Sequence, residues 1–446
     1  MLVRRPNLIV SLPRIALHSY ATSPEEKYSL EPVNPSEKLI TPENQHAVIS
    51  DIVTPLANMD YLSQLKVKKK WSGKILRKIK EMPIPKVQTT LHTIIPSPVV
   101  DHYRNKDEFS IRTGVDGNPK TVGYFAGSPA KGDVVCIGPK GLKNMKPHHT
   151  KLAEVFQELV RESPLKACHD LHDGGFWRSI TVRSNQKGDT MVVIVTHPNG
   201  ASKEEEEGAK LLIKERFLDY NVTSLFYQSS PHTRAPHDVV PYELLMGEPH
   251  IYEWIGEYRF RISPDSFFQV NVEAAPLLYD KAIHFVDPSP KSTLLDLCCG
   301  TGTVSIFASK MFRGCVGIDA IKHAIDDAEF NASSNHVFNC HFTTGLVEKS
   351  LGRILSELDM SPELSAILNP GRSGCNKRVT NTLRQSLQIR NLVYISCKAD
   401  HPNVMSNFYE LSHPKFDGVP FQLTDVQPVD MFPHTNHCEL MLVFRR

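Results

Sequence analysis

The chain has 446 residues, which at ~100–200 residues per domain suggests two or three domains with a sizeable core. Hydrophobic residues make up 40% and charged residues 22%, which is ordinary for a soluble globular protein. The formal net charge is only +2, so the overall charge indicates no class of partner, and no apolar run approaches the ~18 residues of a membrane span.

Nine cysteines are spread along the chain without any C-x-x-C pair. The odd number and low density predict neither a disulfide framework nor a zinc ribbon. There is also no closely spaced triplet of the kind that holds an iron–sulfur cluster. The cysteines therefore favour a reducing compartment, or one without a disulfide requirement.

Residues 1–24 have the composition of a mitochondrial transit peptide. They contain three arginines and three serines, and the first acidic residue is Glu25. The apolar stretch is too short for a secretory signal and is interrupted by Pro6 and Pro13. We expect a transit peptide that directs the protein to the mitochondrial matrix; a plain disordered tail is the alternative. Residues 25–50 are polar and contain prolines, which predicts a flexible linker.

Residues 51–85 are predicted to form a basic helical segment. From Lys66 to Lys80 there are eight basic residues and no acidic one, with Trp71 among them. Basic groups neutralise phosphates and an aromatic ring can stack on a base, so this run is compatible with RNA contact. A solvated helix face is the alternative, as for most charge runs.

Residues 86–260 have the pattern of a mixed α/β region. Strand-like stretches with turn signals between them alternate with two amphipathic helices. The expected strands are 108–115, 120–127, 176–184 and 189–198, and the expected helices are 150–162 and 204–220.

From about residue 290, short apolar runs alternate with helical stretches, which predicts a parallel, doubly wound sheet. In such sheets, ligands bind beyond the carboxyl ends of the strands. The four apolar runs are followed by a glycine-rich turn, by an acid, by an Asn-Pro loop and by a cysteine. These are "CCGTG" (298–302), Asp319, Asn369-Pro370 and Ser396-Cys397.

The glycine-rich turn indicates a nucleotide-like ligand. Gly300 and Gly302 would let the backbone approach such a ligand closely. Ser305 stands where a dinucleotide fingerprint has its third glycine, and a nicotinamide cofactor remains the alternative. Asp296 followed by Gly300 and Gly302 resembles the first motif of S-adenosylmethionine-dependent methyltransferases. Asp319, 23 residues after Asp296, stands where an acid would bind ribose hydroxyls.

The Asn-Pro loop offers Asn369, whose amide can bind an adenine or a base edge. The following Pro-Gly pair keeps the loop tight. Methyltransferases of exocyclic amines have an aromatic residue at the position that Arg372 occupies here. A target exocyclic amine is therefore disfavoured.

Cys397 follows an apolar run, and three interpretations are open: a buried hydrophobe, a metal ligand or a nucleophile. Glu439 begins the last apolar stretch. If that stretch forms a strand antiparallel to the others, Glu439 lies at the same edge as Cys397. His434 and His437 with Cys438 suggest a metal site, but no partner cluster exists elsewhere in the sequence.

Several segments, taken in order, resemble the motif set of the RNA uracil-5-methyltransferases. They span roughly residue 50 to the C-terminus and are most similar to the animal mitochondrial branch that modifies tRNA. The segments are "VTPLANMDYLSQLKVK" (53–68), "YRNKDEFSI" (103–111), "SPDSFFQVN" (263–271), "LLDLCCGTGTVS" (294–305), "NPGR" (369–372), "VYISC" (393–397) and "FPHTNHCE" (432–439).

The resemblance implies a Rossmann-like methyltransferase domain at 261–446, with a mostly parallel doubly wound sheet and an antiparallel closing strand. It also implies that the mixed α/β region at 86–260 recognises RNA. The implied cofactor is S-adenosyl-L-methionine, with no metal. Cys397 would be the nucleophile and Glu439 the base. The residues that would contact the methyl donor are Gln269, Asp319 and Asn369, beside the motif residues Asp296, Gly300 and Gly302.

The implied activity is methylation of C5 of a uridine in RNA, in the T-loop of mitochondrial tRNA. Ribosomal RNA is the alternative substrate, and an RNA-binding folding chaperone without catalysis is the alternative function. No protein partner and no membrane are implied, and we expect a monomer. Two positions depart from the family: Asn369 stands where bacterial members have an aspartate, and Asp319 where many members have a glutamate.

The implied chemistry makes physical demands on Cys397 and Glu439. C5 of uracil is a poor nucleophile, and a thiolate added at C6 activates it. A free cysteine has a pKa of ~8.5, so a nearby cation such as Lys398 or Arg372 would help. A base must then remove the C5 proton, and Glu439 suits this role. Phe267 and Phe268 would either stack on the base or cofactor, or pack in the core.

Overall fold

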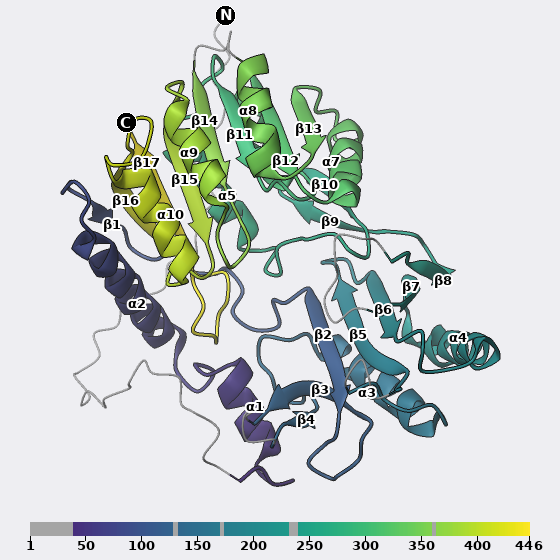
Figure 1. Ribbon diagram of the computed structural model, residues 1–446. Helices are drawn as coiled ribbons and strands as arrows, with labels where there is room; N and C mark the ends of the chain where they lie inside the picture. Colours follow the sequence, from purple (N-terminus) through teal and green to yellow (C-terminus); the bar gives the residue numbers. More distant parts are fainter. Residues whose placement is uncertain (1–38, 128–132, 170–173, 232–239, 359–362) are drawn as a thin grey trace, which may run out of the picture. The chain divides into compact units, whose positions relative to one another are not determined.

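The computed structural model describes residues 39–127, 133–169, 174–231, 240–358 and 363–446. The expected transit peptide at 1–24 lies outside these residues. The described chain contains one sheet of eight strands, one of seven and a two-stranded hairpin (Figure 1). None of its helices is both long and apolar enough to span a bilayer.

The seven-stranded sheet is formed by residues 106–247 in the order β4-β3-β2-β5-β6-β7-β8. Its neighbours are antiparallel except β6 and β7, which are parallel and are joined by a crossover helix, α4 (Lys203–Phe217). The expected strands and helices of this region are present. Helix α3 (Pro147–Glu162) lies between β4 and β5 in the chain. The strands are β2 (Lys106–Arg112), β3 (Thr121–Ala126), β4 (Val135–Ile137), β5 (Trp177–Ser184), β6 (Thr190–Thr196), β7 (Ser224–Ser229) and β8 (Glu243–Gly247).

The expected helical segment after residue 50 is two helices, α1 (Gln45–Val53) and α2 (Tyr61–Glu81). Pro55 lies in the break between them, and proline disfavours helical backbone at the residue before it. The side chain of Asp60 caps the first turn of α2 by accepting a backbone N–H. The break places α1 and α2 on different sheets.

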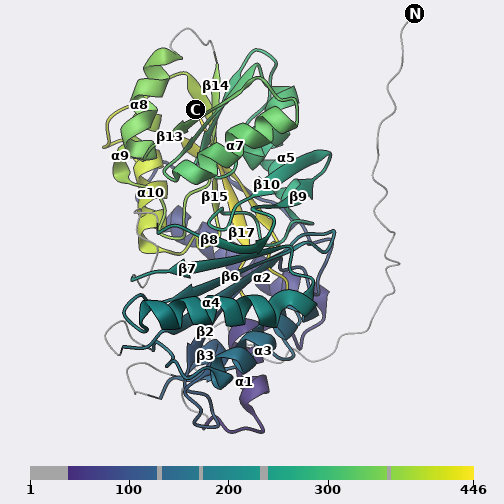
Figure 2. The same ribbon diagram turned by 90° about the vertical axis from the view of Figure 1, so that its right-hand side faces the viewer.

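Helix α1 begins within residues 25–50, which we expected to be a flexible linker. Its Val48 and Ile49 are buried in the core of the seven-stranded sheet, together with side chains of α3 and α4. In Figure 2, α1, α3 and α4 lie with this sheet. The apolar residues of α1 begin only at Ala47, at the end of a polar, proline-containing stretch, so the sequence signal for a helix there is weak, although burial of Val48 and Ile49 fixes it.

The eight-stranded sheet has the order β1-β16-β17-β15-β14-β11-β12-β13. Strands β11 to β15 are parallel, and β17 is antiparallel to both β15 and β16. The expected Rossmann-like fold with an antiparallel closing strand is confirmed. The strands are β1 (Thr90–Leu91), β11 (Thr293–Leu297), β12 (Gly314–Asp319), β13 (Cys340–Thr344), β14 (Leu364–Leu368), β15 (Ile389–Ser396), β16 (Gln422–Val429) and β17 (Glu439–Arg445).

Helices cover both faces of this sheet, as expected for a doubly wound fold (Figure 1). Because successive side chains of a strand point to opposite faces, β17 contributes Leu440 and Leu442 to one core cluster and Met441 and Val443 to the other. One face carries α5 (Ala275–Phe285), α6 (Thr303–Ala308) and α7 (Lys322–Ser334), near the hairpin of β9 (Ile251–Ile255) and β10 (Tyr258–Ile262). The other carries α2, α8 (Val347–Glu357), α9 (Lys377–Gln385) and α10 (Pro402–Ser412).

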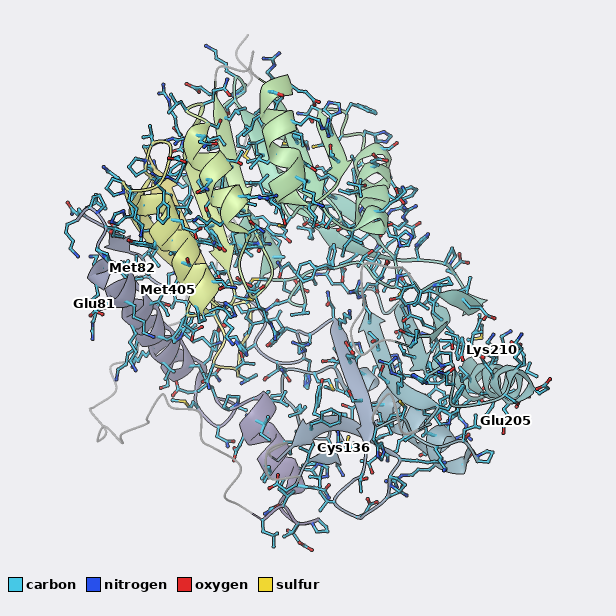
Figure 3. All side chains as sticks on the ribbon, in the orientation of Figure 1. Glu81, Met82, Cys136, Glu205, Lys210 and Met405 are labelled. Atoms are coloured by element: carbon cyan, nitrogen blue, oxygen red, sulfur yellow. The ribbon has the colours of Figure 1, made fainter. Side chains whose placement is uncertain are left out.

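Helix α2 therefore belongs to the eight-stranded sheet, although it precedes the parallel strands of that sheet by more than two hundred residues. It lies beside α10 and contacts β16. Its Ile75 and Ile79 are buried in the core. Figure 3 labels Met82 at the end of α2 and Met405 on α10, and both pack against this core cluster.

Candidate active site

The predicted site residues meet at one edge of the eight-stranded sheet. The parallel register pairs Leu297 with Leu368, so the residues that follow β11 and β14 leave the sheet together. The antiparallel register pairs Ser396 with Leu440, and the next positions along the same register are Cys397 and Glu439. The expectation that an antiparallel last strand brings Glu439 to Cys397 is therefore confirmed at the level of backbone register.

A pocket opens where the strand order reverses, between β11 and β14, which is the usual ligand position in such sheets. It contains four of the six residues predicted to bind the methyl donor. The lining residues are Gln269, Asp296, Gly300 and Asn369, with Phe267, Phe268, Tyr279, Cys298, Cys299, Thr301, Thr303 and Val304.

The remaining two predicted residues, Asp319 and Gly302, shape the turn that forms the pocket wall. The carboxylate of Asp319 accepts hydrogen bonds from the backbone N–H groups of Gly300 and Ile321, both at 2.9 Å. Gly302 has a φ of +78°, and a Cβ atom there would lie 2.8 Å from the Phe342 ring. Only glycine fits this position without rearrangement.

Asp296 fixes the start of α6. Its Oδ2 accepts hydrogen bonds from the backbone N–H of Ser305 at 3.0 Å and from the Ser305 hydroxyl at 2.8 Å. Its Oδ1 is buried and has no hydrogen-bond partner. Burial raises the pKa of this carboxyl to about 6. An unpartnered buried acceptor in a pocket wall suits a ligand that brings a hydroxyl or amino group.

S-adenosyl-L-methionine fits the chemistry of this pocket, because it carries ribose hydroxyls, an amino group and an adenine. The pocket offers carboxylate oxygens and the side-chain amides of Gln269 and Asn369. Phe267 is 62% exposed at its rim, whereas Phe268 is buried and packs on Phe260. Of the two adjacent phenylalanines, Phe267 is thus available for stacking and Phe268 is a core residue.

Cys397 is half-buried beside Arg372. Burial is the main cause that raises the pKa of its thiol to about 11, and the charge of Glu439 raises it further. The Arg372 guanidinium lowers the pKa of the thiol, because it hydrogen-bonds the sulfur and attracts the thiolate. Of the two cations suggested by the sequence, Arg372 is placed on the thiol.

Glu439 is buried, and its Oε2 has no hydrogen-bond partner. Burial raises the pKa of this carboxyl to about 8, so it is largely neutral at pH 7. A neutral carboxyl opposes ionisation of Cys397 less than a carboxylate does. When the carboxyl is deprotonated, the unpartnered Oε2 is an available acceptor for a proton from a substrate.

The metal interpretation finds no support among the residues that the structure describes, since no group of three potential ligands is present there. The ring nitrogens of His434 contact Asp101 at 2.7 Å and Gln64 at 3.1 Å. The Cys438 thiol is buried against backbone carbonyls. Both side chains thus have protein partners.

The basic run of α2 has two faces. Seven of its eight basic side chains are exposed, and the exception is Lys68. Lys68 is fully buried, with its ammonium 2.5 Å from Asp430 Oδ1 and 2.7 Å from the Phe432 carbonyl oxygen. Trp71 is half-buried against the core. The expected contact of this run with RNA therefore excludes Lys68 and applies only to the outer face.

Comparison with known proteins places this site in a family. Residues 255–446 match the model of the tRNA (Uracil-5-)-methyltransferase family. The tRNA (uracil-5-)-methyltransferase homolog B of Danio rerio is 41% identical over 416 residues, which covers 89% of this chain and 86% of that protein. The chain belongs to the tRNA (uracil-5-)-methyltransferase family.

Other members support the same assignment. Homolog B of Homo sapiens is 39% identical over 422 residues, covering 89% of this chain and 84% of that protein. The crystal structure of the Pyrococcus abyssi tRNA (uracil-54, C5)-methyltransferase in complex with S-adenosyl-L-homocysteine superimposes with a TM-score of 0.61 at 21% identity. It covers 87% of this chain and 84% of that chain and agrees with the Rossmann-like fold.

Two residues of this tRNA (uracil-5-)-methyltransferase contribute to the site although their sequence context does not mark them as site residues. Tyr279 of α5 lines the pocket, and its hydroxyl contacts Gln269 and Thr303. Lys68 holds the chain that leads to Glu439. Tyr279 lies in an ordinary amphipathic helix and Lys68 in a run of similar lysines, so neither stands out in the sequence.

Proposed function

We propose that the protein methylates C5 of a uridine in tRNA, with Cys397 as nucleophile and Glu439 as base. The observation that carries this proposal is that Cys397 directly follows the end of β15 and Glu439 begins the paired strand β17, at the same sheet edge as the donor pocket. A nucleophile and a base beside a donor site are the parts that C5 methylation requires.

The steps follow from the reactivity of uracil. The Cys397 thiolate adds to C6, which forms an S–C6 bond and places the electron pair of the C5–C6 double bond on C5 and O4. Bound S-adenosyl-L-methionine would supply an electrophilic methyl group to C5, with cleavage of the bond from the methyl group to the sulfonium sulfur and S-adenosyl-L-homocysteine as the leaving group. Glu439 then accepts the C5 proton, the double bond re-forms, and the S–C6 bond breaks to release Cys397.

The donor is proposed to lie in the pocket between β11 and β14. Asp319 would bind the ribose hydroxyls, and Asn369 the adenine. Gln269 lines the pocket and its amide contacts the Tyr279 hydroxyl. It would contact the amino-acid end of the methyl donor. Asp296 would act through its free Oδ1 and through the turn that it fixes.

The exposed basic face of α2 and the mixed α/β region at 86–260 are proposed to bind RNA. The exposed basic residues of α2 supply positive charge without an interspersed acid, which suits a phosphate backbone. The target uridine must leave its stack to reach Cys397, which takes a few kcal/mol. We further propose the T-loop of mitochondrial tRNA as the target, on the basis of the motif resemblance and the composition of residues 1–24.

The test is incubation of the purified protein with methyl-labelled donor and an unmodified tRNA transcript. We expect label in 5-methyluridine and its loss by at least ~10²-fold in Cys397→Ala, because C5 is not activated unless the thiolate adds at C6. Donor binding by Cys397→Ala should persist, because the donor pocket does not include this residue. Label on cytosine or adenine, or label transfer that survives Cys397→Ala, would rule out the proposal.

A further inference from the structure

The segment between β16 and β17, residues 430–438, is held by parts of the chain far away in sequence. Its backbone carbonyls from residue 431 to residue 434 each accept a hydrogen bond from a different residue. The donors are Asn271 to Met431 at 3.1 Å, Lys68 to Phe432 at 2.7 Å, Tyr103 to Pro433 at 3.1 Å and the Leu56 N–H to His434 at 2.9 Å.

Helix α2 makes a second set of bonds to the same segment. Lys68 also pairs with Asp430, and neither side chain is exposed. The Gln64 side chain accepts from the His434 backbone N–H at 2.7 Å and contacts the His434 ring at 3.1 Å. Lys68 and Gln64, one turn apart on the inner face of α2, therefore fix both the start and the middle of the segment.

This arrangement is more than is needed to attach the helix. Ile75, Leu76 and Ile79 already bury the C-terminal half of α2 in the core. Burial disfavours the charged form of a lysine and lowers the pKa of Lys68, and its contacts with Asp430 and with the Phe432 carbonyl oxygen oppose this effect. A buried lysine of this kind fixes the positions of the groups that it contacts, here Asp430 and the backbone of Phe432.

The partner that matters is Glu439, which follows His434 by five residues. We propose that Lys68 and Gln64 are positioning residues: they hold residues 430–438 so that Glu439 reaches the C5 proton. Because the outer face of α2 is basic, the same helix would link RNA contact to the elimination step. This inference rests on the proposed function and goes beyond it, since it assigns a catalytic consequence to a helix that packs on the catalytic sheet but precedes residues 261–446 in the sequence.

The consequence is specific to one step. A displacement of about 1 Å can slow catalysis by about 10²-fold, and the step affected here would be proton removal by Glu439. Addition of Cys397 and methyl transfer would continue, so the covalent protein–RNA adduct would accumulate. Glu439→Gln should accumulate the same adduct, whereas a merely structural role of Lys68 would lower activity without any adduct.

The experiment uses the full chain with unmodified tRNA and methyl-labelled donor, and it measures the covalent adduct on a denaturing gel. For Lys68→Met we expect an adduct fraction at least ~10-fold above wild type and a lower kcat, with KM for tRNA changed by less than ~3-fold. The matched variant is Lys69→Met, the same change at the adjacent exposed lysine. It should raise KM and leave the adduct fraction at the wild-type level.

The outcomes separate the inference from the proposed function. If Glu439→Gln accumulates adduct and Lys68→Met loses activity without adduct, Lys68 is not a positioning residue and the inference is overturned. If Glu439→Gln accumulates no adduct, the assignment of the base itself fails. Should Lys68→Met fail to bind donor because it does not fold, Gln64→Ala decides: accumulated adduct supports the inference, and its absence overturns it.

Discussion

At the scale of single residues, the site combines two acids that burial keeps protonated. The pKa of Cys397 is raised to about 11 and that of Glu439 to about 8, mainly by burial in both cases. Both groups act in their deprotonated form, as nucleophile and as base. Arg372 favours the thiolate, and its exposed side chain reaches Cys397 from the loop after β14.

The first prediction concerns pH. Since both pKa values are raised above neutrality, the deprotonated fraction of each group is small at pH 7 and grows as the pH rises. We therefore expect kcat/KM for tRNA methylation to increase between pH 7 and pH 9. A series of initial rates with labelled donor measures this. A flat or falling profile would mean that deprotonation of Cys397 or Glu439 does not limit the reaction.

The Arg372→Gln variant tests the cause of this profile. Loss of the cation that lowers the thiol pKa should move the rising limb to higher pH, so that the rate at pH 7.5 falls by about tenfold for each unit of displacement. Lys398→Gln, at an exposed cation next to Cys397, is the matched control and should displace the profile less. Equal displacement in both variants would contradict the assignment to Arg372.

The sequence named both Arg372 and Lys398 as candidate cations but had no means of choosing between them. β14 and β15 are neighbours in the sheet, so the loops after them meet. Whether a long side chain in one loop reaches a thiol in the other depends on side-chain packing. Side-chain packing also decides the roles of Phe267 and Phe268, which the sequence could not distinguish. The exposed fraction is 62% for Phe267 and 3% for Phe268.

At the scale of elements, the sequence predicted α2 and β17, but it predicted neither the neighbouring strand β16 nor the burial of Lys68 in α2. The closing apolar stretch predicted β17, and its antiparallel direction made Glu439 a neighbour of Cys397. Strand β16 has a mixed polar sequence that includes Pro428, so no periodicity marked it. In α2, Lys68 looks like its lysine neighbours, and only the tertiary structure distinguishes the buried one.

The prediction at this scale concerns the exposed face of α2. A lysine that neutralises one phosphate contributes ~0.7–0.9 to the slope of log affinity against log salt. We expect Lys69→Ala combined with Lys70→Ala to weaken tRNA binding and to reduce this slope by about 1–2, while donor affinity stays unchanged. Fluorescence titrations at several salt concentrations measure both. An unchanged slope would show that this face does not bind the RNA backbone.

At the scale of the whole molecule, α2 and the strand β1 come from the N-terminal half and complete the C-terminal sheet. The motif resemblance predicted the family and the Rossmann-like fold, and both are confirmed. Periodicity alone would have separated α2 from the catalytic domain, because helices of an N-terminal segment carry no signal of the sheet on which they pack.

The prediction for the whole protein concerns its RNA target. We propose tRNA in the mitochondrial matrix, and mapping of 5-methyluridine in total RNA from cells that lack the protein tests this. Loss of the T-loop modification from mitochondrial tRNA is expected. A loss confined to ribosomal RNA would move the assignment to the alternative substrate, and a reporter fused to residues 1–24 that stays outside mitochondria would contradict the proposed location.

The central claim, a covalent adduct through Cys397, is tested most directly with tRNA that contains 5-fluorouridine. Fluorine at C5 cannot be removed as a proton by Glu439, so the S–C6 bond should persist after methyl transfer. We predict that mass spectrometry of the digested protein finds a methylated fluorouridine nucleotide on the peptide that contains Cys397. Attachment to another residue, or undiminished turnover of the natural tRNA by Cys397→Ser, would contradict the account.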